Sequence, residues 1–363
     1  MVSQTQPTLV AVIGIGLVGA EFVDQLLAQP KERFQIVSLS TSRVTLFNAS
    51  GLDLSSNWRS VFQQTNAPTI LSALLGELRA LVEAGRKVVL VDNTSAENVA
   101  NMYPNFLAAG VNVITPNKKA FSGEQKLFED ILAASEKSSA RFLNESTVGA
   151  GLPIISTLKD LVGTGDEVTK IEGVFSGTMS YIFNNFSTSA SGGPAFSSVV
   201  NVARDSGYTE PHPGDDLNGA DVARKLTILS RTIPALRSAL PEGYKSVETR
   251  SLVPKAIDGL ATGSEFMSRL PEFDTEFDTL RAEAQKEGKV LRYVGVIDVE
   301  KGVIKASLEK YENTHAFATS LGGSDNIIMF HTKRYGARPL IVQGAGAGAA
   351  VTAMGVLSDL LKL

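Results

Sequence analysis

The sequence predicts an α/β protein that is divided into two domains. Its 363 residues are more than a single typical hydrophobic core accommodates. The first third alternates short apolar runs with amphipathic helical segments, which is the pattern of β-α-β units in a parallel sheet. After residue 150 this pattern changes, and residues 289–335 contain three runs that alternate like antiparallel strands.

Four apolar runs justify the parallel sheet of the first domain. Strands are expected at residues 8–13, 33–40, 87–95 and 111–116. The third is nearly unbroken in its hydrophobicity, as expected for a strand that is buried on both faces. An amphipathic helix follows the first strand and ends before Pro30.

The second domain is expected to combine helices with an antiparallel sheet. Its first helices are expected at residues 151–162, 180–188 and 199–207 and from Leu217 onward, with a strand at 170–176. Residues 237–288 are interpreted as a peripheral helical insertion. The expected domain boundaries are 1–150 for the first domain, completed by 338–363, and 151–337 for the second.

Composition and charge exclude several classes of protein. The net charge of -4 provides no basic field for nucleic acid, so we expect no nucleic-acid partner. The absence of cysteine excludes disulfides, a thiolate nucleophile and cysteine-ligated zinc. The N-terminus lacks the basic segment and cleavage site of a secretory signal, which predicts a cytoplasmic protein. The uncharged segment 340–357 is long enough for a membrane span, but Gln343, Thr352 and its glycines favour a strand followed by a helix.

A glycine motif, GIGLVG, lies between the first strand and the first helix. Such a motif needs its first glycine for a tight turn, its second for backbone contact with a pyrophosphate, and its third for close helix packing. The alternative is a glycine-rich turn that binds nothing. The context favours a dinucleotide site formed by Gly14, Ile15, Gly16, Leu17, Val18 and Gly19.

The end of the second strand bears on which dinucleotide is bound. NAD is usually held by an acid at this position, and no Asp or Glu lies between Phe34 and Leu52. The hydroxyl of Ser40, followed by two more hydroxyl residues and the guanidinium of Arg43, suits a 2′-phosphate. NADP is therefore favoured, and NAD remains open.

Two polar loops follow the third and fourth strands, at the strand ends where parallel sheets bind ligands. Asn93, Thr94 and Ser95 form the first and are either cofactor contacts or the N-cap of the next helix. Lys118 lies in the second loop, where the alternative is surface charge.

The segment 215–225, DDLNGADVARK, concentrates charge at the beginning of a helix. Asp221 precedes Lys225 by four residues, which is also the spacing of a common surface ion pair. With Glu210 and Asp216 nearby, the carboxylates could instead hold a substrate's ammonium group. A lysine beside them can stabilise the oxygen that gains charge when a carbonyl is reduced, and can give it a proton.

Seven motifs together resemble one family. They are GIGLVG, VDNTS, TPNKKAF, NESTVGAGLPI, FSGTMSYIFN, GYTEPHPGDDLNGADVARK and QGAGAGAAVTAMGVLSDL, and they resemble homoserine dehydrogenase, specifically its short fungal-type form. The resemblance runs from residue 9 to the C-terminus. It implies interconversion of L-homoserine and L-aspartate 4-semialdehyde with NAD(P)H, in threonine, methionine and isoleucine biosynthesis. It also implies a Rossmann-type domain, a mixed α/β substrate domain and a homodimer; because the chain ends at Leu363, no regulatory domain is expected.

The resemblance also assigns residues. It implies acid-base roles for Lys225 and Lys118, with Lys118 also near the cofactor. It implies that the substrate amino acid is held by Glu210, Asp216, Asp221, Gly177 and Thr178. It implies a sodium or potassium ion bound mainly by backbone carbonyls of Glu145, Val148, Ala150 and Leu152. Gly348 is implied as a cofactor contact, and simple helix packing is its alternative.

Two other functions are compatible with the residues alone. One is a different NADP reductase acting on another small aldehyde or keto acid, although phosphorylating semialdehyde dehydrogenases are excluded because they need a thiol. The other is an NADP-binding sensor without catalysis. The three histidines lack metal-ligand spacing and are interpreted as structural or surface groups; they are His212, His315 and His331.

Overall fold

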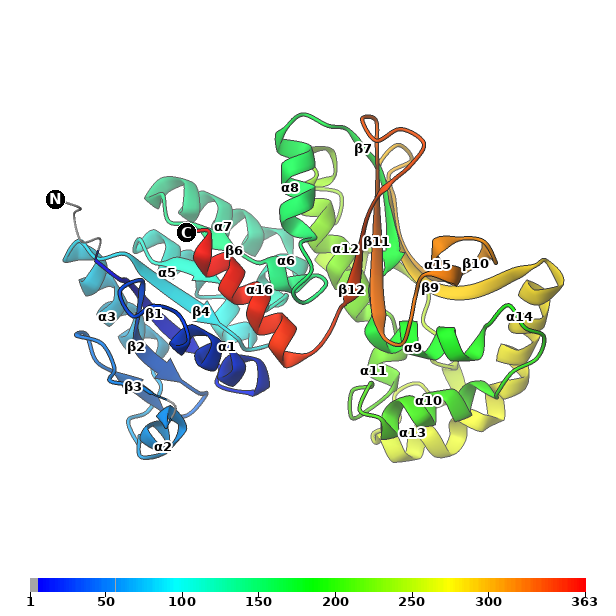
Figure 1. Ribbon diagram of the computed structural model, residues 1–363, viewed down its shortest axis with the longest axis horizontal. Helices are drawn as coiled ribbons and strands as arrows, with labels where there is room; N and C mark the ends of the chain where they lie inside the picture. Colours follow the sequence, from blue (N-terminus) through cyan, green and yellow to red (C-terminus); the bar gives the residue numbers. More distant parts are fainter. Residues whose placement is uncertain (1–5, 56) are drawn as a thin grey trace. The chain divides into compact units, whose positions relative to one another are not determined.

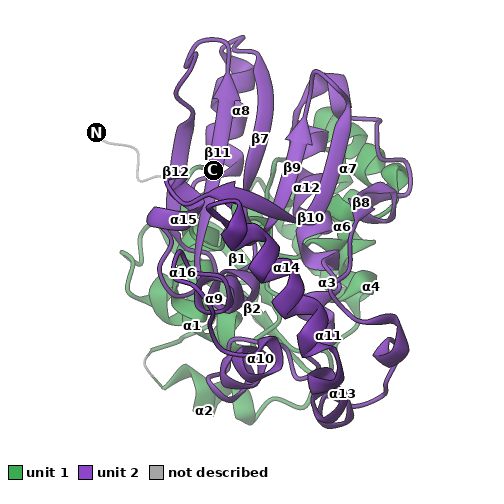
Figure 2. Cartoon of the chain, turned by 90° about the vertical axis from the view of Figure 1, so that its right-hand side faces the viewer, with its two compact units in different colours: residues 1–151, 348–363 green, residues 152–347 purple. Residues whose placement is uncertain are grey.

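The structure is a computed structural model that describes residues 6–55 and 57–363 (Figure 1). It divides into two compact units, shown in Figure 2. The first consists of Met1–Gly151 and Gly348–Leu363, and the second of Leu152–Ala347. The return to the first unit lies about ten residues later than residue 338, because residues 340–345 pair with a strand of the second unit.

A six-stranded sheet, ordered β3-β2-β1-β4-β5-β6, forms the centre of the first unit. Its strands are parallel except for β3, which forms an antiparallel hairpin with β2. Neither this hairpin nor the short β6 was predicted from the sequence. The strands are β1 (Thr8–Ile13), β2 (Phe34–Ser40), β3 (Thr45–Phe47), β4 (Val88–Asp92), β5 (Asn112–Ile114) and β6 (Phe142–Leu143). The strand order reverses between β1 and β4, where such sheets bind ligands.

Helices cover both faces of this sheet. The N-terminal α1 and the C-terminal α16 pack side by side, and Phe22, Ala353 and Val356 belong to one buried apolar cluster with Val10 and Val12 of β1 (Figure 1). The helices are α1 (Leu17–Leu27), α2 (Trp58–Gln63), α3 (Leu71–Glu83), α4 (Glu97–Ala100), α5 (Tyr103–Ala108), α6 (Lys119–Ser122), α7 (Gln125–Ser138) and α16 (Ala349–Leu361), with a 3-10 turn η1 (Glu145–Thr147).

The second unit also contains a six-stranded sheet, ordered β12-β11-β7-β9-β10-β8. Its pairs are antiparallel except for β8 with β10. The strands are β7 (Val168–Val174), β8 (Glu248–Thr249), β9 (Lys289–Asp298), β10 (Val303–Glu312), β11 (Asp325–Thr332) and β12 (Leu340–Ala345). This confirms the antiparallel runs that were expected between residues 289 and 335.

Helices α9, α12 and α14 pack against β9 of this sheet. The helices of the unit are α8 (Ile155–Gly163), α9 (Gly177–Phe186), α10 (Phe196–Asp205), α11 (Gly214–Leu217), α12 (Ala220–Thr232), α13 (Gly263–Arg269), α14 (Asp274–Lys286) and α15 (Ala316–Thr319). Four 3-10 turns complete it: η2 (Pro234–Leu236), η3 (Gly243–Ser246), η4 (Lys255–Ile257) and η5 (Leu270–Phe273). The insertion 237–288 is mainly helical, as expected, but also contributes β8 to the sheet.

The single helix that was expected from Leu217 onward is wrong. The chain forms a short helix, α11, and then α12, which are separated at Gly219. Gly219 has a φ of 78°, a left-handed conformation that ends one helix and favours glycine. The expected core face of α12 is confirmed, since Val222, Leu226 and Leu229 are buried.

No helix in the described part of the chain is long and apolar enough to cross a membrane. The segment 340–357 instead contains β12 and most of α16, as the sequence analysis expected.

Candidate active site

The glycine motif forms a tight turn between β1 and α1. Gly14 has a φ of 87°, and a side chain there would lie 2.6 Å from the Thr94 side chain. A Cβ on Gly19 would lie 1.8 Å from the Gly14 carbonyl oxygen, so this position allows α1 to pack on the turn. In contrast, a Cβ on Gly16 would meet nothing within 4 Å. The helix begins without a capping side chain or an acid in its first turn, which suits an anion.

Gly16→Ala therefore tests whether an anion approaches this turn. We expect the variant to keep the wild-type melting temperature, because the added methyl meets open space. We expect its dissociation constant for NADPH to rise by about tenfold or more, since overpacking against a bound group costs about 1–3 kcal/mol. NADPH fluorescence and thermal unfolding measure the two effects. Gly76→Ala in α3, also in open space, is the control; equal NADPH affinity in both variants would contradict a pyrophosphate at Gly16.

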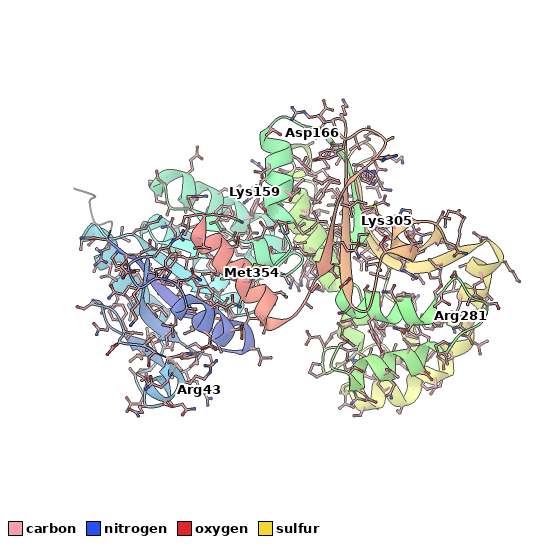
Figure 3. The ribbon with its side chains drawn as sticks, in the orientation of Figure 1. Arg43, Lys159, Asp166, Arg281, Lys305 and Met354 are labelled. Carbon is pink, nitrogen blue, oxygen red and sulfur yellow. The ribbon has the colours of Figure 1, made fainter. Side chains whose placement is uncertain are left out.

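Two residues at the end of β2, Ser40 and Arg43, are predicted to bind a 2′-phosphate, and they differ in their exposure to solvent. Ser40 is fully buried, and its hydroxyl accepts a hydrogen bond from the Thr45 hydroxyl at 3.0 Å. Arg43 is exposed in the turn between β2 and β3 (Figure 3). The backbone N–H of Arg43 donates to the Thr41 hydroxyl, and its carbonyl accepts from Thr69, which hold the turn. The Arg43 residue is therefore accessible from solvent, whereas the Ser40 side chain is buried.

A buried carboxylate, Asp92 at the end of β4, connects the two polar loops. One carboxylate oxygen accepts from the Thr94 backbone N–H at 2.8 Å. The other accepts from the Tyr103 hydroxyl at 2.5 Å and from the Asn117 amide at 3.1 Å. Burial raises the pKa of Asp92, and burial beside this carboxylate raises the pKa of Tyr103. This group was not predicted from the sequence, because its partners come from separate segments.

The loop after β4 carries side chains that can contact a cofactor. The N-cap residue of α4 is Ala96, without a side-chain cap, so Asn93, Thr94 and Ser95 do not cap this helix. Both polar atoms of the Asn93 side chain are buried without a hydrogen-bond partner in the described structure. A buried amide without partners is costly, and a bound polar ligand would satisfy it.

The loop after β5 positions Lys118 at the beginning of α6. The Asn117 side chain donates to the Ala96 carbonyl at 3.0 Å and accepts from the Lys119 N–H at 3.0 Å. Lys118 is partly buried, and its carbonyl accepts from the Ser122 hydroxyl at 2.8 Å. Asn117 thus ties the backbone around Lys118 to the loop that carries Asn93.

In the second unit, Lys225 of α12 is an almost fully buried cation. Its side chain is only 8% exposed. Its Nζ donates to the Phe175 carbonyl at 2.6 Å and lies 2.7 Å from a carboxylate oxygen of Asp221. Asp221 and Lys225 thus form the ion pair that this spacing predicts, but the pair is not fully at the surface, because the Asp221 side chain is 45% exposed and the Lys225 side chain is buried. Such a buried ammonium group needs strong partners because desolvation is costly.

A second carboxylate, Asp216 of α11, lies beside the beginning of α9. It accepts from the Thr178 hydroxyl at 2.8 Å and from the Glu210 backbone N–H at 2.7 Å. The Thr178 hydroxyl is also 2.6 Å from the Tyr208 carbonyl, so its single hydrogen is shared between two acceptors. Burial, followed by the nearby charges of Glu210 and Asp221, raises the pKa of Asp216 to about 6.

Gly177 is the first residue of α9 and allows this helix to approach Ser324, which immediately precedes β11. A Cβ there would lie 3.1 Å from the Ser324 carbonyl oxygen. The helix is capped by the Ser176 hydroxyl, which accepts from the Met179 N–H at 3.2 Å. The structure thus brings Thr178, Asp216 and Glu210 together in one network, and Lys225 and Asp221 in one ion pair.

The proposed cation loop follows β6 and contains an unusual backbone. Gly149 and Ala150 have φ values of 77° and 55°, and a left-handed alanine is uncommon. The Ala150 carbonyl faces α16, where a Cβ on Gly355 would lie 2.8 Å from it. Glu145 is buried, its N–H donates to Asp359 at 2.8 Å, and its carbonyl accepts from Val148 at 3.2 Å.

Residues 14–145 match the model of the homoserine dehydrogenase NAD-binding domain, and residues 153–361 match that of homoserine dehydrogenase. The chain is 46% identical to a homoserine dehydrogenase of Schizosaccharomyces pombe, covering 98% of this chain and 94% of that protein. The chain belongs to the homoserine dehydrogenase family.

Solved structures share this fold. A crystal structure of a Candida auris protein of unknown function is 44% identical, covers 99% of this chain and 98% of its own, and has a TM-score of 0.91. A hyperthermophilic archaeal homoserine dehydrogenase in complex with NADPH is 20% identical, with 99% and 97% coverage and a TM-score of 0.69. The predicted α/β fold with a Rossmann-type first domain is confirmed.

Membership of the homoserine dehydrogenase family establishes the reaction. The protein is an NAD(P)-dependent oxidoreductase that interconverts L-homoserine and L-aspartate 4-semialdehyde in amino-acid biosynthesis. Family membership therefore favours this reaction over the two functions that the residues alone left open, the sensor and the reductase for another substrate.

Gly348 and the histidines of this homoserine dehydrogenase family member have local structural roles. Gly348 precedes α16 with a φ of 115°, and its carbonyl accepts from the Thr352 hydroxyl at 2.7 Å. His212 accepts from the Gly214 N–H and His315 from the Phe317 N–H, each at 3.1 Å. His331 lies 2.9 Å from Glu172. Among the residues that the structure describes, no cluster of His, Cys, Asp or Glu could hold a metal ion.

Proposed function

We propose that Lys225 is the acid-base residue of the reaction. The observation that carries this proposal is a buried ammonium group held by the Phe175 carbonyl and the Asp221 carboxylate. A bound nicotinamide cofactor supplies or accepts the hydride at the carbon that bears the oxygen. When the aldehyde is reduced, its oxygen gains charge, and Lys225 stabilises that charge and gives the oxygen a proton. In the reverse direction, neutral Lys225 accepts the proton of the homoserine hydroxyl.

Lys118 is proposed as a second lysine at the reacting centre. Its support is its place at the carboxyl end of the parallel sheet, where Asn117 fixes the surrounding backbone. Two ammonium groups at one oxygen would stabilise negative charge more strongly than one, although only one of them needs to transfer the proton.

The carboxylates of the second unit are proposed to hold the amino acid. The Asp216 carboxylate accepts hydrogen bonds from the Glu210 backbone N–H and from the Thr178 hydroxyl, which fix its orientation. Burial, and then the negative charges of Glu210 and Asp221, raise the pKa of Asp216, and an arriving ammonium group would compensate that negative charge. Asp221 already neutralises Lys225, so its proposed role is to hold both the lysine and the substrate. Gly177 would line the same pocket through its backbone.

NADP is the proposed physiological cofactor, and the exposed Arg43 is its proposed phosphate contact. We expect Arg43→Ala to raise the dissociation constant for NADPH by about tenfold, as for one lost charged hydrogen bond, and to leave that for NADH unchanged. Fluorescence titration of both cofactors measures this difference. Arg79→Ala, which removes another exposed arginine of the same unit, is the control. An equal loss of affinity for both cofactors would contradict the assignment.

A monovalent cation is proposed at the loop that contains Glu145, Val148, Ala150 and Leu152. Backbone carbonyls suit sodium or potassium, and the left-handed residues 149 and 150 turn the chain sharply between them. The Leu152 carbonyl also accepts from the Ile154 N–H at 2.9 Å, which leaves a second lone pair for an ion. Activity that is unchanged when all sodium and potassium is replaced by tetramethylammonium would contradict a required ion.

Homodimer formation and a cytoplasmic location are also proposed, and both rest on the sequence. A solution mass near that of a single 38.6 kDa chain in light scattering would contradict the dimer. Cell fractionation tests the location.

The direct test of the function is consumption of NADPH with L-aspartate 4-semialdehyde. We expect turnover that requires both compounds and yields homoserine. Tight NADPH binding without turnover would contradict catalysis by this chain.

A further inference from the structure

The Phe175 carbonyl oxygen accepts hydrogen bonds from two side chains in the second unit. The Lys225 ammonium donates to it at 2.6 Å, and the Asn326 amide donates to it at 3.0 Å. A carbonyl oxygen has two lone pairs, so these two donors saturate it. Asn326 therefore shares an acceptor with the proposed acid-base lysine.

Asn326 is fixed and fully buried at the beginning of β11. It is 0% exposed, and its backbone pairs with Gly344 of β12. The next pair, Ile327 with Val174, places Asn326 beside the end of β7, where Phe175 follows. The other amide atom of the side chain, Oδ1, is buried without a hydrogen-bond partner among the described residues. A buried, half-satisfied amide is costly, which indicates a role beyond packing.

The chain after β12 passes directly over this amide. A Cβ on Gly346 would lie 2.1 Å from both Cγ and Nδ2 of Asn326. Gly346 has no positive φ, so the close approach, not the backbone conformation, requires glycine there. The GAGAGA motif thus contains a glycine that leaves room for the Asn326 side chain in its observed position.

We propose that Asn326 is a positioning residue for catalysis: its amide holds the Phe175 carbonyl in the orientation that fixes the Lys225 ammonium. This inference rests on the proposed role of Lys225. Gly346 belongs to the same arrangement because it keeps the amide in place.

Asn326 restricts the positions that the Lys225 ammonium group can take, because both side chains bind the same carbonyl oxygen. Without the amide, the Phe175 carbonyl loses one of the two donors that fix its orientation. The position of the ammonium then depends more on Asp221, whose side chain is 45% exposed. Small displacements of a catalytic group reduce turnover strongly, because proton transfer requires a defined geometry.

Asn326→Leu tests the proposal, since leucine has a similar shape and no donor. We expect kcat to fall by about tenfold, as for one lost positioning hydrogen bond. We expect the NADPH dissociation constant and the KM for homoserine to change by less than about twofold, because the proposed binding groups are retained. The primary deuterium isotope effect on kcat should rise as the chemical step becomes slower. Thr332→Val is the matched control, because it removes another buried hydrogen bond from β11, far along the strand at Asp166.

Asn326→Ala is the second variant and avoids a clash if leucine does not fit. Alanine has no group that can donate to the Phe175 carbonyl, so kcat should fall in the folded variant. Gly346→Ala should reproduce the kinetic effect, because its methyl displaces the amide. Its control is Gly322→Ala, where a Cβ meets nothing within 4 Å and φ is not positive.

Lys225→Ala, measured in parallel, separates this inference from the proposed function. Wild-type turnover in Lys225→Ala would overturn the role of the lysine itself. Loss of turnover there, with unchanged kcat and isotope effect in folded Asn326→Leu or Asn326→Ala, would overturn only the positioning role. An effect on kcat that Thr332→Val reproduces at equal loss of stability would also overturn it.

Discussion

Lys225→Ala is expected to lower kcat by about a hundredfold or more, as for a lost general acid, while NADPH binding remains near that of the wild type. The ammonium group is buried, so its removal eliminates both the proton donor and the charge that stabilises the developing alkoxide. Because the residues that match the NAD-binding domain belong to the first unit, the affinity for NADPH should depend little on this side chain. Steady-state turnover and fluorescence titration of NADPH provide the two measurements.

Two further variants distinguish charge from proton transfer and one lysine from the other. Lys225→Arg retains a positive charge that does not lose its proton at neutral pH, so turnover should remain low. Lys118→Ala should lower kcat less than Lys225→Ala; the opposite order would assign the proton to Lys118. Lys333→Ala removes an exposed lysine that pairs with Glu167 and should leave kcat unchanged. Normal turnover in Lys225→Ala would refute the mechanism.

The KM for homoserine is expected to rise as the pH falls through about 6. Burial raises the pKa of Asp216 to about 6, so its carboxylate becomes neutral below that pH and no longer attracts an ammonium group. Asp216→Asn should raise this KM at neutral pH by about tenfold or more, which corresponds to one charged hydrogen bond of about 1.5–3 kcal/mol. The variant should also lose the rise of KM between pH 7 and 5 that the wild type shows, if the KM is measured at saturating cofactor.

The dependence of protein stability on pH provides an independent test of the raised pKa of Asp216. The native-state pKa of about 6 exceeds the ordinary value of 3.8, so the native protein binds the proton more tightly than the unfolded chain. Asp216 therefore contributes stability that is lost as the pH rises from about 4 to about 6. Without substrate, Asp216→Asn should gain stability relative to the wild type across this window. Asp215→Asn, at the exposed neighbouring acid, is the control. A constant stability difference across the window would contradict the raised pKa.

Local patterns predicted the elements that bear the cofactor turn. The apolar runs of β1 and β2, the helical spacing of apolar residues in α1 and the three glycines are each properties of one continuous segment. Each of these elements is present as expected. Boundaries that depend on pairing were less predictable. The segment 340–345 has the composition of a strand in either unit, and only its pairing with β11 assigns it to the second.

Without the family resemblance, contacts within the candidate site could be predicted only where the groups lie close together in the sequence. Asp221 and Lys225 are four residues apart, and their spacing placed them on one helical face. Asp92 and Asn326 gave no such signal, because Asp92 meets Asn117 across 25 residues and Asn326 meets Phe175 across 151. Each of these contacts exists because two strands end beside each other, which sheet topology decides and hydrophobic periodicity does not reveal.

The return of the C-terminal helix to the first unit has a consequence for synthesis on the ribosome. Ala353, Val356 and Leu360 of α16 fill the same apolar cluster as Phe22 of α1, so the first unit lacks part of its interior until α16 has been made. The second unit, continuous from Leu152 to Ala347, is complete earlier. At about 5–20 residues per second, translation of the second unit delays α16 behind the rest of the first unit by about 10–40 s. The hydrophobic core of the nascent first unit is therefore incomplete while the second unit is being made. During that time its apolar surface is exposed and can be bound by chaperones.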